Sequence, residues 1–222
     1  MDLVWSSGHN IIFVFLPGKN NNKVNVTHTR TKVFFRISTD STDALADISF
    51  RIVDQSRYEE ILDLLYTNFH TDEPMSKAVQ MIDREGTRNK VLDDFALDGL
   101  VQNLSIMAID PVTDGLLGVS INVEAKKESK EKSLEETLEE YDDPRFKHIM
   151  TVLYYVNQKA GNLFDEMESD VIFDIKMVTT DKNQRRGGLA TDLLRRSVEL
   201  ARNLGFKAVK TEATGKTYFK LN

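Results

Sequence analysis

The sequence contains no cysteine, and that absence excludes several kinds of chemistry. The chain can form no disulfide, offer no thiolate to a metal ion and use no cysteine nucleophile. We expect no metal cofactor. The composition is compatible with a reducing compartment.

The chain also lacks a long apolar run. The run near its start, residues 11–16, is ended by Pro17, whereas a membrane-spanning helix needs about 20 apolar residues. The first residues include Asp2 but no basic cluster and no small-residue cleavage site, so no secretory signal is predicted. We therefore expect a cytoplasmic protein with no membrane partner.

An excess of positive charge is missing as well. The formal net charge is -6, whereas a protein that binds nucleic acid mainly by electrostatics gathers many Lys and Arg. Two arginine pairs occur, at 185–186 and 195–196, but helical spacing keeps them apart and no aromatic residues lie between them. Nucleic acid is not an expected partner, and any anion site must be local.

The chain does have enough apolar residues for a core. Of its 222 residues, 41% are hydrophobic and 29% are charged, which is typical of a folded globular protein. Residues 1–46 are predicted to form an irregular N-terminal arm with a β-rich stretch at 32–37. Residues 47–222 are predicted to form the domain.

The first half of the domain opens with a strand and a helix. Alternation of apolar and polar residues at 48–53 predicts a half-buried strand. Apolar residues at helical spacing from Tyr58 to Phe69 predict a helix, and Ser56 with Glu59 has the spacing of a capping box at its start.

A proline then marks a turn. Pro74 disfavours helix for the residue before it and so places Glu73 in the turn. A second helical stretch is expected between residues 76 and 100. Strand patterns at 104–109 and 115–123, separated by turn residues, predict a hairpin.

The second half continues in the same way. The Lys- and Glu-rich segment 126–143 is predicted to be solvated loop or exposed helix. An apolar stripe across 146–154 predicts a helix, and 171–178 predicts a buried strand. A glycine turn and an amphipathic helix follow, with Gly205 as its C-cap.

The turn before that last helix has the composition of an anion site. Arg185, Arg186, Gly187 and Gly188 precede the first helical amides, which have no intrahelical partner and carry the positive end of the helix dipole. Glycine lets the backbone approach a ligand, and the guanidinium groups can bind phosphate oxygens. Neither a P-loop nor a dinucleotide fingerprint is present. From these residues alone, a phosphate site and a plain glycine turn both stay open.

Three residues here match the signature of the GNAT superfamily: Arg or Gln, two residues, Gly, one residue, then Gly or Ala. Arg185, Gly188 and Ala190 stand at these offsets. Residues 69–74, which contain Asp-Glu-Pro, and 204–215, which contain Thr-Glu-Ala-Thr-Gly, resemble the insect arylalkylamine N-acetyltransferase-like branch. The resemblance implies an α+β fold whose mixed, mostly antiparallel central sheet is flanked by helices.

The resemblance also implies acetyl-CoA as cosubstrate and a small amine as its partner. It places the pyrophosphate on the amides of the glycine turn and the pantetheine arm beside the end of the preceding strand, where backbone amides would polarise the thioester carbonyl. The cofactor-binding residues implied are Met177, Val178, Thr179, Thr180, Arg185, Arg186, Gly187, Gly188, Leu189 and Ala190.

A general base is needed because an alkylamine is mostly protonated at neutral pH. The resemblance implies Glu73, the glutamate of Asp-Glu-Pro. His70 is the rival base, since its ordinary pKa suits the task. His148 has no companion motif, and Tyr218 is a candidate acid for the leaving thiolate.

The match stops near the end of the chain. Relatives continue past Ala-Thr-Gly with Tyr-Ser and further strands, whereas here residues 216–222 close the sequence. We therefore expect a C-terminally incomplete domain whose sheet lacks its last strands and has an open edge. Two functions follow: an arylalkylamine N-acetyltransferase, or a catalytically weak or silent acyl-CoA-binding module.

Overall fold

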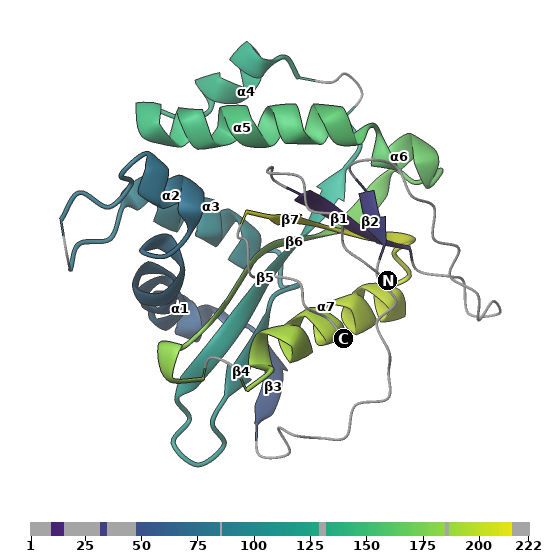
Figure 1. The fold of residues 1–222 in the computed structure, drawn as a ribbon. Coiled ribbons are helices and arrows are strands. Elements are labelled where there is room, and N and C mark those ends of the chain that lie inside the picture. The colour runs from purple at the N-terminus through teal and green to yellow at the C-terminus, as the bar shows by residue number, and fades with distance from the viewer. Residues whose placement is uncertain are drawn as a thin grey trace.

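The computed structural model describes residues 10–15, 32–34, 48–84, 86–128, 132–184 and 187–214. In this part of the chain seven strands form one sheet with helices on both faces (Figure 1). Its order is β2-β1-β7-β6-β5-β4-β3, and only the pairs β1–β2 and β6–β7 are parallel. The mostly antiparallel sheet expected from the sequence is confirmed. The strands are β1 (Asn10–Phe15), β2 (Lys32–Phe34), β3 (Ser49–Ile52), β4 (Ile106–Ile109), β5 (Leu116–Lys126), β6 (Val171–Thr180) and β7 (Ala208–Ala213).

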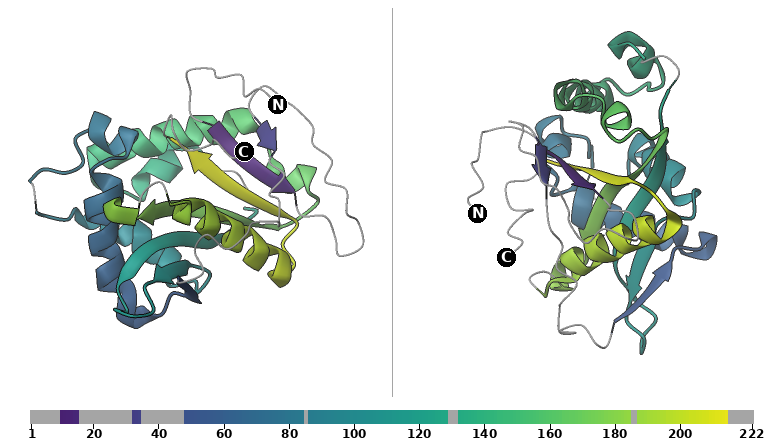
Figure 2. Two further views of the ribbon diagram at one scale, coloured as in Figure 1. Left: turned by 60° about the horizontal axis from the view of Figure 1, so that its bottom comes forward. Right: turned by 90° about the vertical axis from the view of Figure 1, so that its right-hand side faces the viewer.

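The helices form two layers around the sheet. Helix α7 covers one face, and α1 and α3 cover the other (Figure 2). No helix in the described ranges combines the length and apolar character that a bilayer crossing requires. The helical segments are η1 (Gln55–Arg57), α1 (Tyr58–Leu65), the π-helix η2 (Tyr66–His70), α2 (Pro74–Ala78), α3 (Lys90–Leu100), α4 (Leu134–Glu139), α5 (Pro144–Ala160), α6 (Leu163–Glu166), η3 (Lys182–Gln184) and α7 (Leu189–Leu204).

The period-two pattern of the strands divides the core between these layers. On β4, Met107 and Ile109 pack with α1 and α3, whereas Ile106 and Ala108 pack with α7. All four are buried. The predicted hairpin is therefore β4 and β5, buried on both faces.

Two local predictions need correction. Asp54 accepts the amide of Ser56 and caps η1, and no side chain caps α1, so the capping box of Ser56 and Glu59 is absent from the start of that helix. The single helical stretch expected between 76 and 100 is two helices, α2 and α3. Asn89 caps α3 by accepting the amide of Val91, which explains why that helix begins at Lys90.

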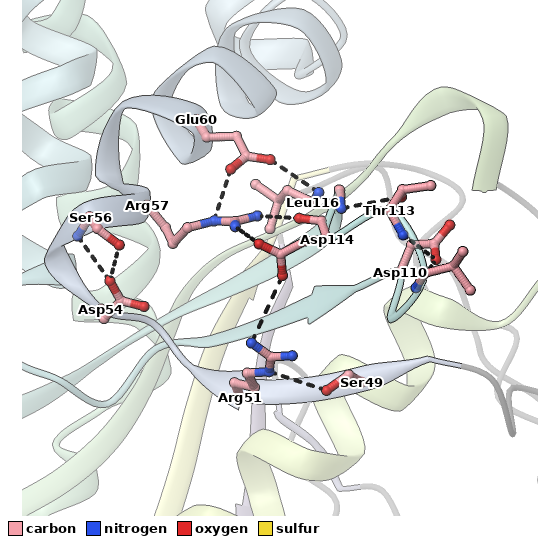
Figure 3. Close-up of polar contacts among 12 residues, drawn as sticks. Ser49, Arg51, Asp54, Ser56, Arg57, Glu60, Asp110, Thr113, Asp114 and Leu116 are labelled. Carbon is pink, nitrogen blue, oxygen red and sulfur yellow. Dashed lines mark hydrogen bonds and ion pairs between the residues drawn. The ribbon is translucent and has the colours of Figure 1, made fainter.

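The start of α1 is tied to the β4–β5 turn by an arginine (Figure 3). The Arg57 guanidinium donates to the Asp114 carboxylate at 2.9 Å and to the Asp114 carbonyl at 2.8 Å, and it pairs with Glu60 at 2.9 Å. Glu60 also accepts the amide of Leu116 at 3.1 Å. These contacts fix the hairpin against the helix that leads to the Asp-Glu-Pro segment.

Two strands come from the segment expected to be an irregular arm. Strand β1 pairs with β7 in antiparallel register, from Asn10 opposite Ala213 to Phe15 opposite Ala208. The edge of β7 that was expected to be open is therefore paired with β1. The apolar run at 11–16 was not predicted to be this strand, and the division of the chain at residue 46 stays a prediction.

The centre of the sheet contains an irregularity on β6. Ile121 and Asn122 are consecutive on β5 but pair with Met177 and Ile175, so Lys176 has no opposite residue and forms a bulge. On its other side β6 pairs with β7 only from Phe173 to Ile175. Beyond the bulge the two parallel strands separate.

A buried polar network holds α7 against the sheet beside this bulge. The Asn122 amide donates to Leu104 O at 2.9 Å and to Ser197 Oγ at 3.1 Å, and Ser197 donates to Ser120 at 2.9 Å. Ser120 in turn donates to Asn122 at 2.9 Å. Asn122, Ser120 and Ser197 are all fully buried, and their bonds fix the position of α7 on the sheet.

We expect Asn122→Ala to lower the free energy of unfolding by about 2–3 kcal/mol, since it leaves buried hydroxyl and carbonyl groups without partners. Urea denaturation at neutral pH measures this. The exposed Asn183, changed to Ala, is the control and should alter stability by no more than about 0.5 kcal/mol. Equal effects for both variants would mean that the network contributes nothing specific.

Candidate active site

A cavity lies where β6 and β7 separate. Its volume is about 160 Å³, and residues from five helical segments and two strands line it. Its walls are mostly apolar, with carboxylates, a histidine and a lysine among them. The lining residues are Phe69, His70, Glu73, Met75, Ser76, Leu92, Phe95, Phe146, Ile149, Leu153, Lys176, Met177, Val178, Ala190, Thr191, Leu194, Thr211, Glu212, Ala213 and Thr214.

Glu73 reaches this cavity as the N-cap of α2. Pro74 occupies the first helical position and keeps Glu73 in an extended conformation with φ -65° and ψ 127°. The carboxylate accepts the amides of Met75 at 3.0 Å and Ser76 at 2.6 Å. The side chain is 8% exposed. A carboxylate has about four acceptor sites, so about two remain for a ligand.

His70 is the last residue of the π-helix that precedes this turn. Its side chain is 4% exposed and lines the same cavity. Burial lowers the pKa of His70 from 6.5 to about 4, although the nearby Glu73 carboxylate acts in the opposite direction. The imidazole is therefore neutral at physiological pH. Neither ring nitrogen has a hydrogen-bond partner among the described residues.

The start of α7 has the properties of an anion site. Gly188 is its N-cap, with φ +85°, and no side-chain cap is formed there. A Cβ at Gly188 would meet no heavy atom of the described chain within 4 Å, so there is open space beside the N-cap. Asp192 in the first turn opposes an anion, but Arg195 pairs with it at 3.2 Å. This end of the helix therefore has amides that no side chain caps, as an anion site requires.

A charged cluster next to the cavity contributes one residue, Glu212, to the cavity wall. Lys210 binds Glu212 at 2.9 Å and lies 3.7 Å from Asp174, and Glu212 also accepts the Asn157 amide at 2.7 Å. Burial raises the pKa of Asp174, and the pKa of Lys210 is raised by these two carboxylates despite burial. In this cluster the carboxylate of Glu212, held by Lys210 and Asn157, forms part of the cavity wall.

Lys176, the bulge residue, contributes a cation to the same cavity. Its ammonium donates to the Phe95 carbonyl at 2.8 Å and lies 3.5 Å from the centre of the Phe95 ring. Burial lowers its pKa, and Asp98 and Asp174 oppose this. The bulge thus places a positive charge one residue before Met177.

The structure brings some of the sequence-predicted site residues together and separates others. Glu73, Met177, Val178 and Ala190 line the cavity with His70. Leu189 is buried in the core between α7 and the sheet, and Thr179 and Thr180 are buried in the ladder with β5. Gly187 is exposed beside Gly188. His148 is exposed on α5, and Arg185, Arg186 and Tyr218 lie outside the described residues.

Sequence reasoning missed several residues that line the cavity. Phe146, Ile149 and Leu153 on α5 form part of its wall, although their helical stripe predicts only packing. Lys176 and Glu212 carried no motif of their own. Only their positions in the sequence could have indicated that they belong to the site. Lys176 directly precedes Met177, and Glu212 lies within the Thr-Glu-Ala-Thr-Gly segment.

No cluster of three or more His, Asp or Glu residues that could hold a metal ion occurs in the part of the chain that the structure describes. No protein-family model matches the chain.

Three solved structures resemble this one. Arylalkylamine N-acetyltransferase 2 from Aedes aegypti has 34% identity and a TM-score of 0.69, over 74% of this chain and 75% of that one. Mosquito arylalkylamine N-acetyltransferase like 5b has 18% identity and a TM-score of 0.61, over 73% and 74%. The Drosophila melanogaster polyamine N-acetyltransferase has 16% identity and a TM-score of 0.63, over 76% and 77%. The last two likenesses concern the fold alone.

Burial of His70 predicts a loss of stability in acid. The unfolded chain binds a proton at a pKa near 6.5 and the folded chain only near 4, so stability is highest above pH 6.5 and falls as the pH is lowered to 4. The fall attributable to this group is about 3 kcal/mol. Urea denaturation between pH 4 and 7 measures it.

In the variant His70→Phe, stability should vary less with pH between 4 and 6.5, because the variant lacks the group that takes up a proton when the chain unfolds. His148→Gln, on the exposed face of α5, is the control and should leave the slope unchanged. An unaltered slope in His70→Phe would show that His70 is not the group responsible.

Proposed function

The chain belongs to the insect arylalkylamine N-acetyltransferases of the GNAT superfamily, and on that premise we propose that it transfers the acetyl group of acetyl-CoA to a small arylalkylamine. One observation carries the proposal. Glu73, the β6 residues Met177 and Val178, and Ala190 at the start of α7 line the same cavity. The base, the thioester-binding strand and the phosphate-binding helix would therefore meet in one space.

Acetyl-CoA, when bound, supplies an activated acyl group, and the chain's own residues would orient it. The first amides of α7 would hold the pyrophosphate, together with Gly187, Gly188 and the two arginines at 185–186. The backbone of β6 from Met177 to Thr180 would hold the pantetheine arm. Support comes from the separation of β6 and β7, since Met177 and the residues after it have no partner on β7 in the described ladder.

Glu73 would accept the proton that the amine must lose. An alkylamine with a pKa of about 10.4 carries a free lone pair in only about one molecule in a thousand at neutral pH, a cost of roughly 4–5 kcal/mol. A carboxylate at the cavity wall reduces that cost by taking the proton, directly or through a water. His70 is a poor alternative, because taking up the proton would make its buried imidazole cationic, and burial disfavours that charge.

The amine's apolar part would occupy the side of the cavity nearest α3 and α5. Phe95, Phe146, Ile149 and Leu153 line that side, and Phe95 and Phe146 meet edge to face at 5.3 Å. Burying an aromatic ring among such side chains is favourable by area and by ring geometry. This supports an aryl-bearing amine as the substrate.

We expect Glu73→Gln to lower kcat/KM for tryptamine or dopamine by about 10²–10⁴, the usual contribution of a general base. Glutamine keeps one of the two oxygens that cap α2 and loses the other, so we expect the free energy of unfolding to fall by about 1 kcal/mol while the protein still folds. Glu73→Asp separates the two roles, since aspartate is a preferred N-cap but retracts the carboxylate from the cavity. The Glu73→Asp variant should therefore fold well, and its kcat/KM should stay as low as that of Glu73→Gln.

Asp72→Asn is the control, because Asp72 is the neighbouring carboxylate and pairs with Lys77 at the surface. Steady-state assays of acetyl-CoA consumption measure all four proteins. Unaltered turnover in Glu73→Gln would remove Glu73 from the mechanism.

Coenzyme binding is tested by isothermal calorimetry with acetyl-CoA on the wild type and on Gly188→Trp. The indole would occupy the open space beside the N-cap of α7, and we expect the affinity to fall at least about tenfold, since a phosphate contact contributes on the order of 1–3 kcal/mol.

Gly205→Trp is the matched control. Gly205 also has a left-handed φ, +87°, and open space around its Cβ, but it lies at the opposite end of α7. Both variants therefore introduce the same backbone strain. Failure of the wild type to bind would overturn the proposal, and binding without turnover on any amine would indicate a silent acyl-CoA-binding module.

A further inference from the structure

His70 combines three properties that are rarely found together. It is 4% exposed, it lines the cavity, and both of its ring nitrogens lack a partner among the described residues. A buried polar atom without a hydrogen bond costs about 1–3 kcal/mol, so such groups are uncommon in folded proteins. Their presence in a cavity wall indicates a partner that binds there.

The backbone holds His70 in this position. It ends the π-helix η2, a form that occurs often at functional sites. The preceding Phe69 packs edge to face against its ring at 5.3 Å. Asn68, two residues earlier, accepts the amide of Lys182 at 2.9 Å and joins η2 to the loop before α7. The ring is therefore placed by packing and by backbone contacts, and its nitrogens are left for a ligand.

The reacting amine has the complementary need. A primary amine that attacks a carbonyl directs its lone pair at the carbon and keeps two N–H groups, and in an apolar cavity each requires an acceptor. Glu73 has about two acceptor sites left and can take one of them. The Lys176 ammonium has hydrogen-bond donors but no acceptor, so it cannot accept the other N–H group. His70, which is electrostatically close to Glu73, has the second acceptor nitrogen.

We propose that His70 binds the substrate amine, and that its bare ring nitrogen accepts one N–H while Glu73 accepts the other. This inference rests on the proposed acetyl transfer and gives His70 a role in it, that of positioning the amine. An amine held by two acceptors must be primary, because an N-alkyl group would replace the N–H that His70 binds. The neutral state of the imidazole keeps this nitrogen free at physiological pH.

The test compares tryptamine with N-methyltryptamine in the wild type, His70→Phe, His70→Gln and His70→Asn. Phenylalanine fills the site but has no acceptor, whereas the amide oxygens of Asn and Gln can replace one ring nitrogen or the other. We expect the ratio of kcat/KM for the primary over the secondary amine to fall about tenfold in His70→Phe, the value of one hydrogen bond. At least one of the two amide variants, His70→Gln or His70→Asn, should retain the wild-type ratio.

Stability separates this role from simple packing. Because His70→Phe removes unpaired polar atoms from a buried site, its melting temperature should equal or exceed that of the wild type while its discrimination falls. His148→Gln is the control and should change neither quantity. A wild-type ratio in His70→Phe would overturn the inference, since steric exclusion alone would then explain the preference.

A measurement that needs no turnover distinguishes this inference from the proposed function. In the full chain labelled with ¹⁵N-histidine, the ring signals of His70 are those that disappear in His70→Phe. Adding tryptamine should shift one of them and leave those of His148 in place. If the wild type acetylates no amine, the proposed function fails, and this shift still decides whether His70 binds the amine. No shift would overturn the inference.

Discussion

The separation of β6 from β7 beyond Ile175 and Thr211 is the constraint on which the rest of the site depends. Two parallel strands that stayed paired would use their backbone groups on each other and leave no space between them. The bulge at Lys176 changes the course of β6 at this point. Helix α7 is fixed on one side of the opening by the Asn122 network, and α5 lies on the other. The cavity exists because the sheet is incomplete at its centre.

Each polar group of the site is placed by a local departure from regular structure. Lys176 occupies a bulge, His70 ends a π-helix, and Gly188 adopts a left-handed conformation. Glu73 caps a helix, a place where Asp, Asn and Ser are preferred. Such features cost stability and persist when the surrounding scaffold holds them. Here that scaffold is a sheet whose strand β4 is buried on both faces.

The sequence predicts the elements with strong patterns, and the structure confirms them. The hairpin of β4 and β5, the strand β6 and the helix α7 with Gly205 at its end all follow from periodicity and glycine. The position of Glu73 in a turn follows from Pro74. These are local effects, which a single sequence contains.

Other parts of the site depend on contacts between distant segments and could not be predicted in the same way. The stripe of Phe146, Ile149 and Leu153 fixes a helix but not the surface that it covers. No local signal distinguishes a π-helix at Tyr66–His70 from a continued α-helix, and the contact that Asn68 of this segment makes with Lys182 joins residues far apart in the sequence. The same hydrogen bond joins the segment that carries His70 to the loop before α7. If a ligand on the loop before α7 displaced this contact and so altered the affinity for a ligand beside His70, the second ligand would alter the affinity for the first by the same factor.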